Sequence, residues 1–154
     1  MKLHVLERNL DIPVTLMEAW EFFSNPRNLP LITPPGLGFR MKSEAPERIY
    51  PGLMLTYTVT PFFGFPVDWV TEITQVREPE FFVDDQRMGP YRLWHHEHAF
   101  EEIRGGVRVR DLVHYALPFG PLGRIAHDLV VKKQLREIFD YRSAYLSSKF
   151  GRIS

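Results

Sequence analysis

The sequence predicts an α+β fold, in which a curved antiparallel sheet of about seven strands lies around one long C-terminal helix. Stretches of alternating polar and apolar residues fill the middle of the chain, separated by glycines and prolines at short intervals typical of hairpins. The pair Gly105-Gly106 predicts the tightest of these turns. After Pro121 the apolar residues recur at helical spacing to about Lys149. At about 1.5 Å per residue, this helix would be roughly 40 Å long, enough to cross a whole sheet.

Two short helices are expected directly after the first strand. Residues 2–9 alternate between apolar and polar side chains, which predicts that strand. Thr15 and Glu18 fit a capping box, in which a hydroxyl and a carboxylate bond the free amides at the start of a helix. The helix is predicted over residues 16–24, where apolar residues recur three and four positions apart. Pro26 permits a second helical turn to about residue 29.

Two apolar segments are predicted to be irregular. Prolines at positions 30, 34 and 35 interrupt the first, over residues 31–35, because proline lacks the amide donor of regular structure. The second is the turn over residues 61–66, which contains Phe62, Phe63 and Phe65. Since surface turns are usually polar, both segments are candidate gates over a pocket, and the second is also a candidate surface for a partner.

Further strands are predicted over residues 38–43, 53–60, 67–76 and 81–87. In the third of them, Trp69 is predicted to share a face with Val67, Thr71 and Ile73. The fourth cannot be assigned a buried face, because aromatic and acidic residues occur on both of its sides.

The hairpin over residues 91–115 concentrates the polar residues of greatest interest. Side chains alternate along a strand, so one face of its first strand carries Trp94, His96, His98 and Phe100. With the turn at Gly105-Gly106, the same face of the second strand carries Val109, Asp111, Val113 and Tyr115. This register places Phe100 opposite Asp111, His98 opposite Val113, and His96 opposite Tyr115. An aromatic face with a few polar groups among the rings is typical of a ligand pocket.

Composition limits the classes of function. A chain of 154 residues is predicted to form one domain over residues 1–154. Nineteen basic residues offset nineteen acidic ones, which argues against a nucleic-acid partner. The absence of cysteine excludes disulfides and thiolate chemistry. Charge and proline come too early for a signal peptide, and no uncharged apolar run approaches the roughly 18 residues of a membrane span, so a cytoplasmic location is expected.

His96 and His98 have three interpretations. A histidine pair on one strand face can ligate a metal, with Asp111 or Glu72 as third ligand, but metal sites need three or four convergent ligands. No further ligand is recognisable, so we predict no metal and no cofactor. With Asp111 as the residue that orients it, the pair is a candidate for catalytic acid–base chemistry. The plainest interpretation is a buried hydrogen-bonded network that includes Tyr115 and braces the hairpin or binds the head group of a ligand.

The C-terminal helix is predicted to bury one stripe, and Arg142 is its polar exception. Arg142 is predicted to pair with Asp111 or Glu72, with an anionic ligand as the alternative partner. The stripe comprises Leu122, Ile125, Leu129, Val131, Leu135, Ile138, Phe139, Arg142, Tyr145 and Leu146. The residues predicted to bind a ligand are Trp20, Phe23, Tyr57, Trp69, Trp94, His96, His98, Phe100, Asp111, Tyr115 and Arg142.

The order of these elements resembles the helix-grip fold of the START-like (SRPBCC) superfamily, near its polyketide cyclase/dehydrase and bacterial ligand-binding branches. The resemblance covers nearly the whole chain. The motifs that carry it are Trp20-x-x-Phe23, Leu31-Ile-Thr-Pro-Pro35, Asp68-Trp69, Phe82-Val-Asp-Asp-Gln86, Gly89-Pro90-Tyr91-x-x-Trp94-His-His-x-His98-x-Phe100, and Asp111-x-Val-x-Tyr115-x-x-Pro118-x-Gly120.

The resemblance implies an apolar cavity between the sheet and the long helix. It implies binding of a hydrophobic small molecule such as a lipid, a polyketide or an isoprenoid-like compound. The alternative is a cyclase/aromatase or dehydratase that works without metal and uses His96, His98 and Asp111 for acid–base chemistry. A homodimer is kept as an alternative to a monomer.

Overall fold

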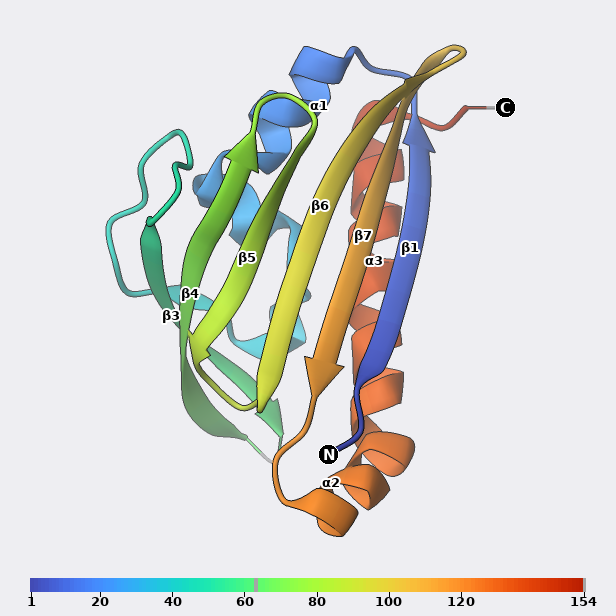
Figure 1. Cartoon of the computed structure of the whole chain (residues 1–154). Coiled ribbons are helices and arrows are strands. Elements are labelled where there is room, and N and C mark those ends of the chain that lie inside the picture. Colours follow the sequence, from blue (N-terminus) through green and yellow to red (C-terminus); the bar gives the residue numbers. More distant parts are fainter. Residues whose placement is uncertain (63, 154) are drawn as a thin grey trace.

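The computed structural model describes residues 1–62 and 64–153, with the backbone alone at residue 62. The strands in this part of the chain form one curved antiparallel sheet of seven strands, in the order β1-β7-β6-β5-β4-β3-β2 (Figure 1). Their bounds are β1 (His4–Ile12), β2 (Arg40–Met41), β3 (Met54–Phe62), β4 (Phe65–Arg77), β5 (Phe81–Met88), β6 (Leu93–Ile103) and β7 (Gly106–Ala116). The predicted α+β class and the curved sheet are therefore confirmed.

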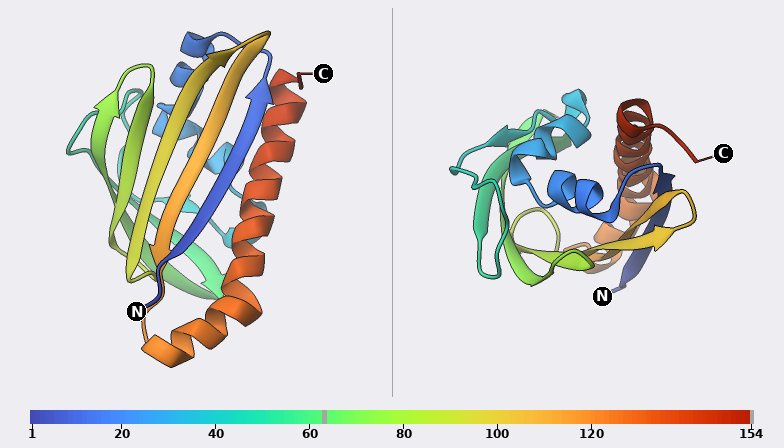
Figure 2. Two further views of the ribbon diagram at one scale, coloured as in Figure 1. Left: turned by 45° about the vertical axis from the view of Figure 1, so that its right-hand side comes forward. Right: turned by 90° about the horizontal axis from the view of Figure 1, so that it is seen from above.

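Short helices follow β1 and cover the concave side of the sheet (Figure 2). The capping box holds α1 (Leu16–Phe23), since the Glu18 amide donates to the Thr15 hydroxyl and the Glu18 carboxylate accepts from the Thr15 amide. The segment predicted to be irregular after Pro30 instead contains two 3₁₀ helices, η1 (Pro26–Ile32) and η2 (Pro35–Leu37). Proline at the first positions of these helices costs no hydrogen bond, because the amides there have no helical partner.

The C-terminal helix has a bend that the sequence pattern did not predict. It begins as α2 (Gly120–Ala126), passes through a π-helical turn, η3 (His127–Val131), and continues as α3 (Lys132–Phe150). Figures 1 and 2 show α3 running along the sheet while α2 turns away beyond its lower end.

The apolar stripe is consequently buried only in part. Val131, Leu135, Phe139 and Leu146 are buried as predicted. The first third of the predicted stripe is wrong, because Leu122, Ile125 and Leu129 are 72%, 56% and 72% exposed. Helical periodicity continues through α2, but the sheet no longer lies opposite it.

The β6–β7 hairpin differs from the predicted register by two residues. Ile103 pairs with Gly106, so Arg104 and Gly105 form the turn, and His98 lies opposite Asp111 rather than Val113. Likewise Phe100 pairs with Val109, His96 with Val113, and Trp94 with Tyr115. A shift of two residues preserves the faces, so every side chain predicted to point inward still does.

Gly106 explains the difference in register. A Cβ added there would overlap the carbonyl oxygen of Ile12 in the neighbouring strand β1. Glycine is therefore needed at this position for the close approach of two strands, and Gly105, with φ of +88°, supplies the turn.

Two apolar clusters enclose the polar centre of the molecule. The ring of Phe82, from the cluster around α1, stacks on His98 with 4.2 Å between centroids. Phe139, from the cluster around α3, packs edge-on against His96 at 5.8 Å. None of the described helices has the length and apolar character needed to cross a membrane.

Candidate ligand-binding site

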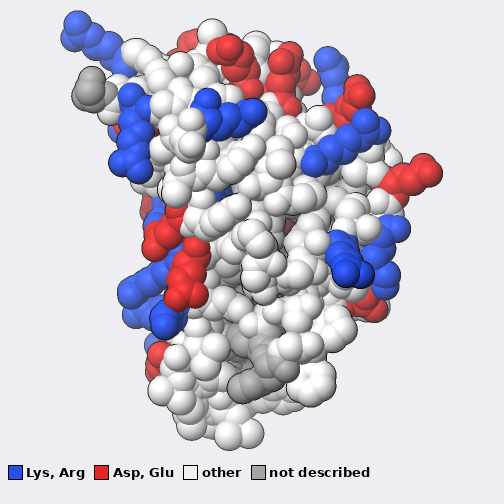
Figure 3. All heavy atoms as spheres, turned by 180° about the vertical axis from the view of Figure 1, so that it is seen from behind, with Lys and Arg blue, Asp and Glu red and all other residues white. Residues whose placement is uncertain are grey.

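A cavity of about 200 Å³ lies between the concave face of the sheet, η1 and α3. Figure 3 shows the face of the molecule opposite to the view of Figure 1, which is hollowed near its centre. The wall is mainly apolar and aromatic. The sheet contributes Tyr57, Trp69, Phe82 and Trp94, and Tyr91 lies beside them in the segment between β5 and β6.

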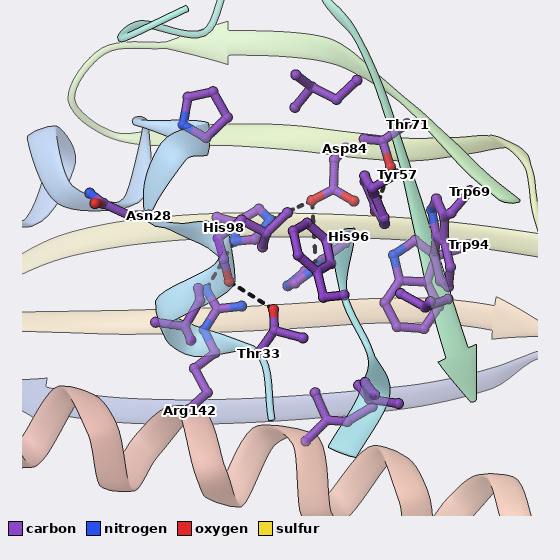
Figure 4. Close-up of a pocket in the computed structure, with 18 of the residues that line it drawn as sticks. Asn28, Thr33, Tyr57, Trp69, Thr71, Asp84, Trp94, His96, His98 and Arg142 are labelled. Carbon is purple, nitrogen blue, oxygen red and sulfur yellow. Dashed lines mark hydrogen bonds and ion pairs between the residues drawn. The ribbon is translucent and has the colours of Figure 1, made fainter. Parts of the chain in front are cut away.

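Trp69 and Trp94 lie together at one end of this cavity (Figure 4). Their rings pack edge to face with centroids 5.4 Å apart. Tyr57 stacks on Trp69 and shares a hydrogen bond of 2.9 Å with the Thr71 hydroxyl. Burial raises the pKa of Tyr57, so its phenol stays neutral.

Three strands and one helix converge on one polar cluster, which comprises Asp84, His96, His98, Asp111 and Arg142. Figure 4 shows Asp84, His96, His98 and Arg142 on the cavity wall. His98 Nε2 lies 2.5 Å from Asp84 Oδ2, and His96 Nε2 lies 2.8 Å from Asp111 Oδ1. The second nitrogen of each ring faces the other carboxylate, at 3.6 Å for His96 Nδ1 to Asp84 and 3.3 Å for His98 Nδ1 to Asp111. Arg142 Nη2 lies 3.3 Å from Asp111 Oδ1.

Both carboxylates in this cluster are ionised. Burial raises the pKa of Asp111, but Arg142 and hydrogen bonds from His96 and His98 outweigh it and hold the pKa well below its ordinary value. Burial raises the pKa of Asp84 as well, and the neighbouring His96, His98 and Arg142 bring it below the ordinary value.

The pKa values of the two imidazoles are shifted in opposite directions. Burial lowers the pKa of His96, and the neighbouring His98 lowers it further, so its carboxylate contacts do not restore it. Burial also lowers the pKa of His98, but hydrogen bonds to Asp111 and Asp84 raise it above 6.5 overall. The two tilted rings have centroids 3.7 Å apart, and the opposite directions of these pKa shifts favour a proton on His98 over one on His96.

Two buried donors on the cavity wall have no hydrogen-bond partner among the described residues. They are the indole Nε1 of Trp69 and the guanidinium Nε of Arg142. An unpaired buried donor costs about 1–3 kcal/mol, which a ligand with an acceptor oxygen would recover.

Seven of the eleven residues predicted to bind a ligand line the cavity: Phe23, Tyr57, Trp69, Trp94, His96, His98 and Arg142. The other four lie elsewhere. Trp20 and Phe100 pack against one another in the core, with centroids 5.7 Å apart. Asp111 lies behind the histidines, and the Tyr115 hydroxyl pairs with His127 Nε2 at 2.8 Å instead of joining the cluster.

Asp84 is the residue that the sequence analysis missed. Asp84 lies in the strand predicted over residues 81–87, whose buried face could not be assigned. Asp85 follows it directly, so each side of that strand carries an aspartate as well as a phenylalanine. The usable signal was Phe82, which shares a face with Asp84 and pairs with His98. Glu72, considered as a partner for the histidines or Arg142, instead forms an ion pair of 2.5 Å with Arg87 on the outside.

The two predicted gates have different outcomes. Ile32 and Thr33 of the first line the cavity. In the second, the side chain of Phe65 is 71% exposed, whereas Phe63 and the side chain of Phe62 lie outside the described residues.

Comparison with known proteins places the fold. No known family profile matches the sequence, and no curated protein matches it. Among solved structures, a START superfamily protein from Mycobacterium smegmatis is similar, with a TM-score of 0.70, 11% identity, and coverage of 96% of this chain and 97% of that one. Ara h 8.0201 is similar with a TM-score of 0.65 and 17% identity, over 96% of this chain and 99% of that one. The major latex-like protein 151 from Panax ginseng is similar with a TM-score of 0.67 and 12% identity, over 96% of this chain and 97% of that one. The chain therefore has the START-like helix-grip fold.

Proposed function

We propose that this protein binds a compact hydrophobic molecule that carries oxygen acceptors. The observation that carries the proposal is the pair of unpaired donors, Trp69 Nε1 and Arg142 Nε, on the wall of an apolar cavity. The chemistry of an aromatic polyketide or a short isoprenoid-like compound matches this wall: rings stack on Trp69 and Trp94, and a carbonyl or carboxylate oxygen accepts from Arg142.

The size of the cavity limits the ligand. Its 200 Å³ is below the roughly 300 Å³ at the lower end of ligand pockets and slightly above the 150 Å³ or so that accommodates benzene. A compact ring system fits this space. A lipid chain would need η1 and α3 to move apart, because Leu29 and Ile138 line the cavity from these two elements.

Native mass spectrometry of protein purified from its own host tests the proposal. We expect a co-purifying compound of low mass that is lost on denaturation. In the same protein, quenching of tryptophan fluorescence by 2-naphthoate, compared with naphthalene, tests the need for an acceptor. Absence of a co-purified compound together with equal binding of both probes contradicts the proposal.

Trp69→Phe provides a sharper test, because it removes the indole donor and keeps an aromatic ring. Loss of a hydrogen bond worth about 1 kcal/mol weakens 2-naphthoate binding about fivefold. Trp20→Phe is the matched control, since Trp20 is buried away from the cavity wall. Equal effects of the two substitutions would assign Trp69 to packing alone.

A second candidate function is a cyclase or dehydratase that uses acid–base catalysis without metal. The observation that favours it is the raised pKa of His98 beside the lowered pKa of His96, both on the cavity wall. Such a pair can give a proton to one substrate atom and take one from another. Substitution of His96 and His98 by Gln would abolish turnover of a polyketide substrate and leave its binding intact; unchanged turnover would exclude this function.

The remaining expectations are unchanged. A single ligand-binding domain over residues 1–154, a cytoplasmic location and a homodimer stay predictions.

A further inference from the structure

We propose that Asp84, His96 and His98 form a site for one divalent transition-metal ion of the Zn²⁺ class, on the wall of the cavity. The proposal concerns the ion alone and does not rest on the hydrophobic ligand. The sequence suggested a histidine pair without a third ligand, and β5 supplies the missing carboxylate.

The three donor atoms converge. Asp84, His96 and His98 each offer one ligand atom, and these three atoms all lie within 4.8 Å of one another. Both His96 Nδ1 and His98 Nε2 face Asp84 Oδ2. Donors bound to one tetrahedral ion at about 2.0–2.2 Å stand roughly 3.5 Å apart. The His96–Asp84 separation of 3.6 Å already matches this spacing. The His98–Asp84 contact of 2.5 Å would open by about 1 Å, which rotation of one carboxylate provides.

Asp111 orients both imidazoles from behind. His96 Nε2 lies 2.8 Å and His98 Nδ1 3.3 Å from Asp111 Oδ1. A proton donated by each of these nitrogens to Asp111 leaves His96 Nδ1 and His98 Nε2 with lone pairs directed toward Asp84. Metal-ligating histidines almost always donate their other ring proton in this manner.

The charges of the cluster favour a cation. Asp84 and Asp111 contribute two negative charges in a buried site, and Arg142 contributes one positive charge. A divalent ion would change the net charge of these groups from minus one to plus one, and the excess would be neutralised by hydroxide or an anionic oxygen in a fourth position that opens into the cavity.

The ligand set points to the class of ion. Two imidazoles and one carboxylate suit Zn²⁺, Co²⁺ and Fe²⁺, whereas Ca²⁺ and Mg²⁺ prefer oxygen ligands. Three protein ligands with one open position are typical of sites that bind a small molecule at the metal.

The untagged full-length protein, stripped with a chelator, provides the test. Isothermal titration with Zn²⁺ is expected to give one site per chain, and Co²⁺ is expected to give the intense visible bands of four- or five-coordinate cobalt. Asp84→Asn and His96→Gln are expected to abolish both signals. Asp111→Asn removes the residue that orients the ligands and is expected to weaken Zn²⁺ binding about 10–100-fold.

The same two strands provide matched controls. Asp85 and His95 are the outward-facing neighbours, paired at 2.6 Å, so Asp85→Asn and His95→Gln change the same chemistry on the solvent side. His4→Gln tests a second imidazole pair, on β1 and η3, in which His4 stacks on His127. All three variants are expected to bind Zn²⁺ as the wild type does.

Two outcomes overturn the proposal. One is wild-type protein that takes up no stoichiometric Zn²⁺ or shows only the pale spectrum of hydrated Co²⁺, which needs no folded variant to interpret. The other is binding that survives Asp84→Asn and is lost in a control variant. Circular dichroism of each variant separates loss of the site from loss of the fold.

Discussion

At Arg142 the helix α3 places a guanidinium within the apolar interior, with its side chain 9% exposed. The group contacts Asp111 and packs over the ring of Phe23, 5.3 Å from its centroid. It stabilises two buried carboxylates that would otherwise share one imidazolium. The helix therefore contributes electrostatic stability to the sheet as well as apolar contact.

Arg142→Met tests this role. Removal of one partner from a buried charge network leaves Asp111 insufficiently compensated, and we expect the free energy of unfolding to fall by about 3–5 kcal/mol. Lys42→Met is the control, since Lys42 pairs with Asp68 at 2.9 Å on the surface with both side chains about half exposed. Urea denaturation should show a loss of about 0–1 kcal/mol for the control. Equal losses would contradict the assigned role.

His98 makes stability depend on pH in the metal-free protein. Asp84 of β5, Asp111 of β7, Arg142 of α3 and His96 of its own strand all face it. Burial lowers the pKa of His98, but the hydrogen bonds and charges of Asp111 and Asp84 raise it above its ordinary value. The pKa of His98 is therefore higher in the folded protein than the value of 6.5 expected in the unfolded chain. Its protonation contributes stability that is fully present below pH 6.5 and is lost as the pH rises through the folded pKa.

We therefore expect the free energy of unfolding to decrease as the pH rises above 6.5, and His98→Gln to flatten this slope. Nitrogen-15 NMR of the two imidazoles should show His98 titrating above 6.5 and His96 below it. The reverse order of titration would refute the assignment of the proton to His98.

At the scale of the elements, the hairpin shows what local pattern determines. The alternation of residues along β6 and β7 correctly predicted which side chains are buried, because the face of each side chain depends only on the two-residue period of a strand. The register was wrong by two residues, because it depends on Gly106 meeting Ile12 of β1, a strand nearly one hundred positions earlier. Asp84 was missed for the same reason. Its face is set by pairing of β5 with β6 and by two irregularities in pairing with β4, none of which is local.

Gly106→Ala tests the close approach of β7 and β1. The added methyl overlaps backbone, which cannot rotate aside, so we expect a loss of about 1–3 kcal/mol or more. Gly36→Ala is the control, because a Cβ there meets nothing within 4 Å and its φ is unstrained, and its effect should stay within about 0.5 kcal/mol. Thermal unfolding of the two variants measures the difference. Similar midpoints would mean that β1 moves aside without cost.

At the scale of the whole molecule, the order of the elements was enough to predict the helix-grip arrangement. It did not predict that the first part of the C-terminal helix lies beyond the sheet. The stripe through Leu135 and Phe139 is buried because the sheet lies opposite it. Leu122 and Leu129 continue the pattern past the edge of the sheet, and sequence periodicity contains no information about where that edge lies. Phe119, at 81% exposure, extends the same apolar end. Figure 3 shows charged residues along the sides and top of the molecule and other residues over its lower end.

This end provides a test of the predicted homodimer. Exposed apolar residues clustered on α2 and η3 favour self-association, so we expect the wild type to associate with rising concentration. Replacement of both Leu122 and Leu129 by Ser should keep the protein monomeric in sedimentation velocity. Val5→Ser, at a 58% exposed position on β1, is the control and should behave as the wild type. Identical sedimentation of all three proteins would exclude α2 and η3 as the interface.

The doublet Asp84-Asp85 has a consequence for how the chain finds its native alignment. Each aspartate faces an imidazole, one inside the sheet and one outside. Sliding β5 by a single residue would turn each of its side chains to the other face and leave only one of the two aspartates opposite a histidine. The same slide would expose to water the ring of Phe82, which now packs on Trp20 and His98. The ion pairs and this one benzyl group therefore select the same alignment of the strand.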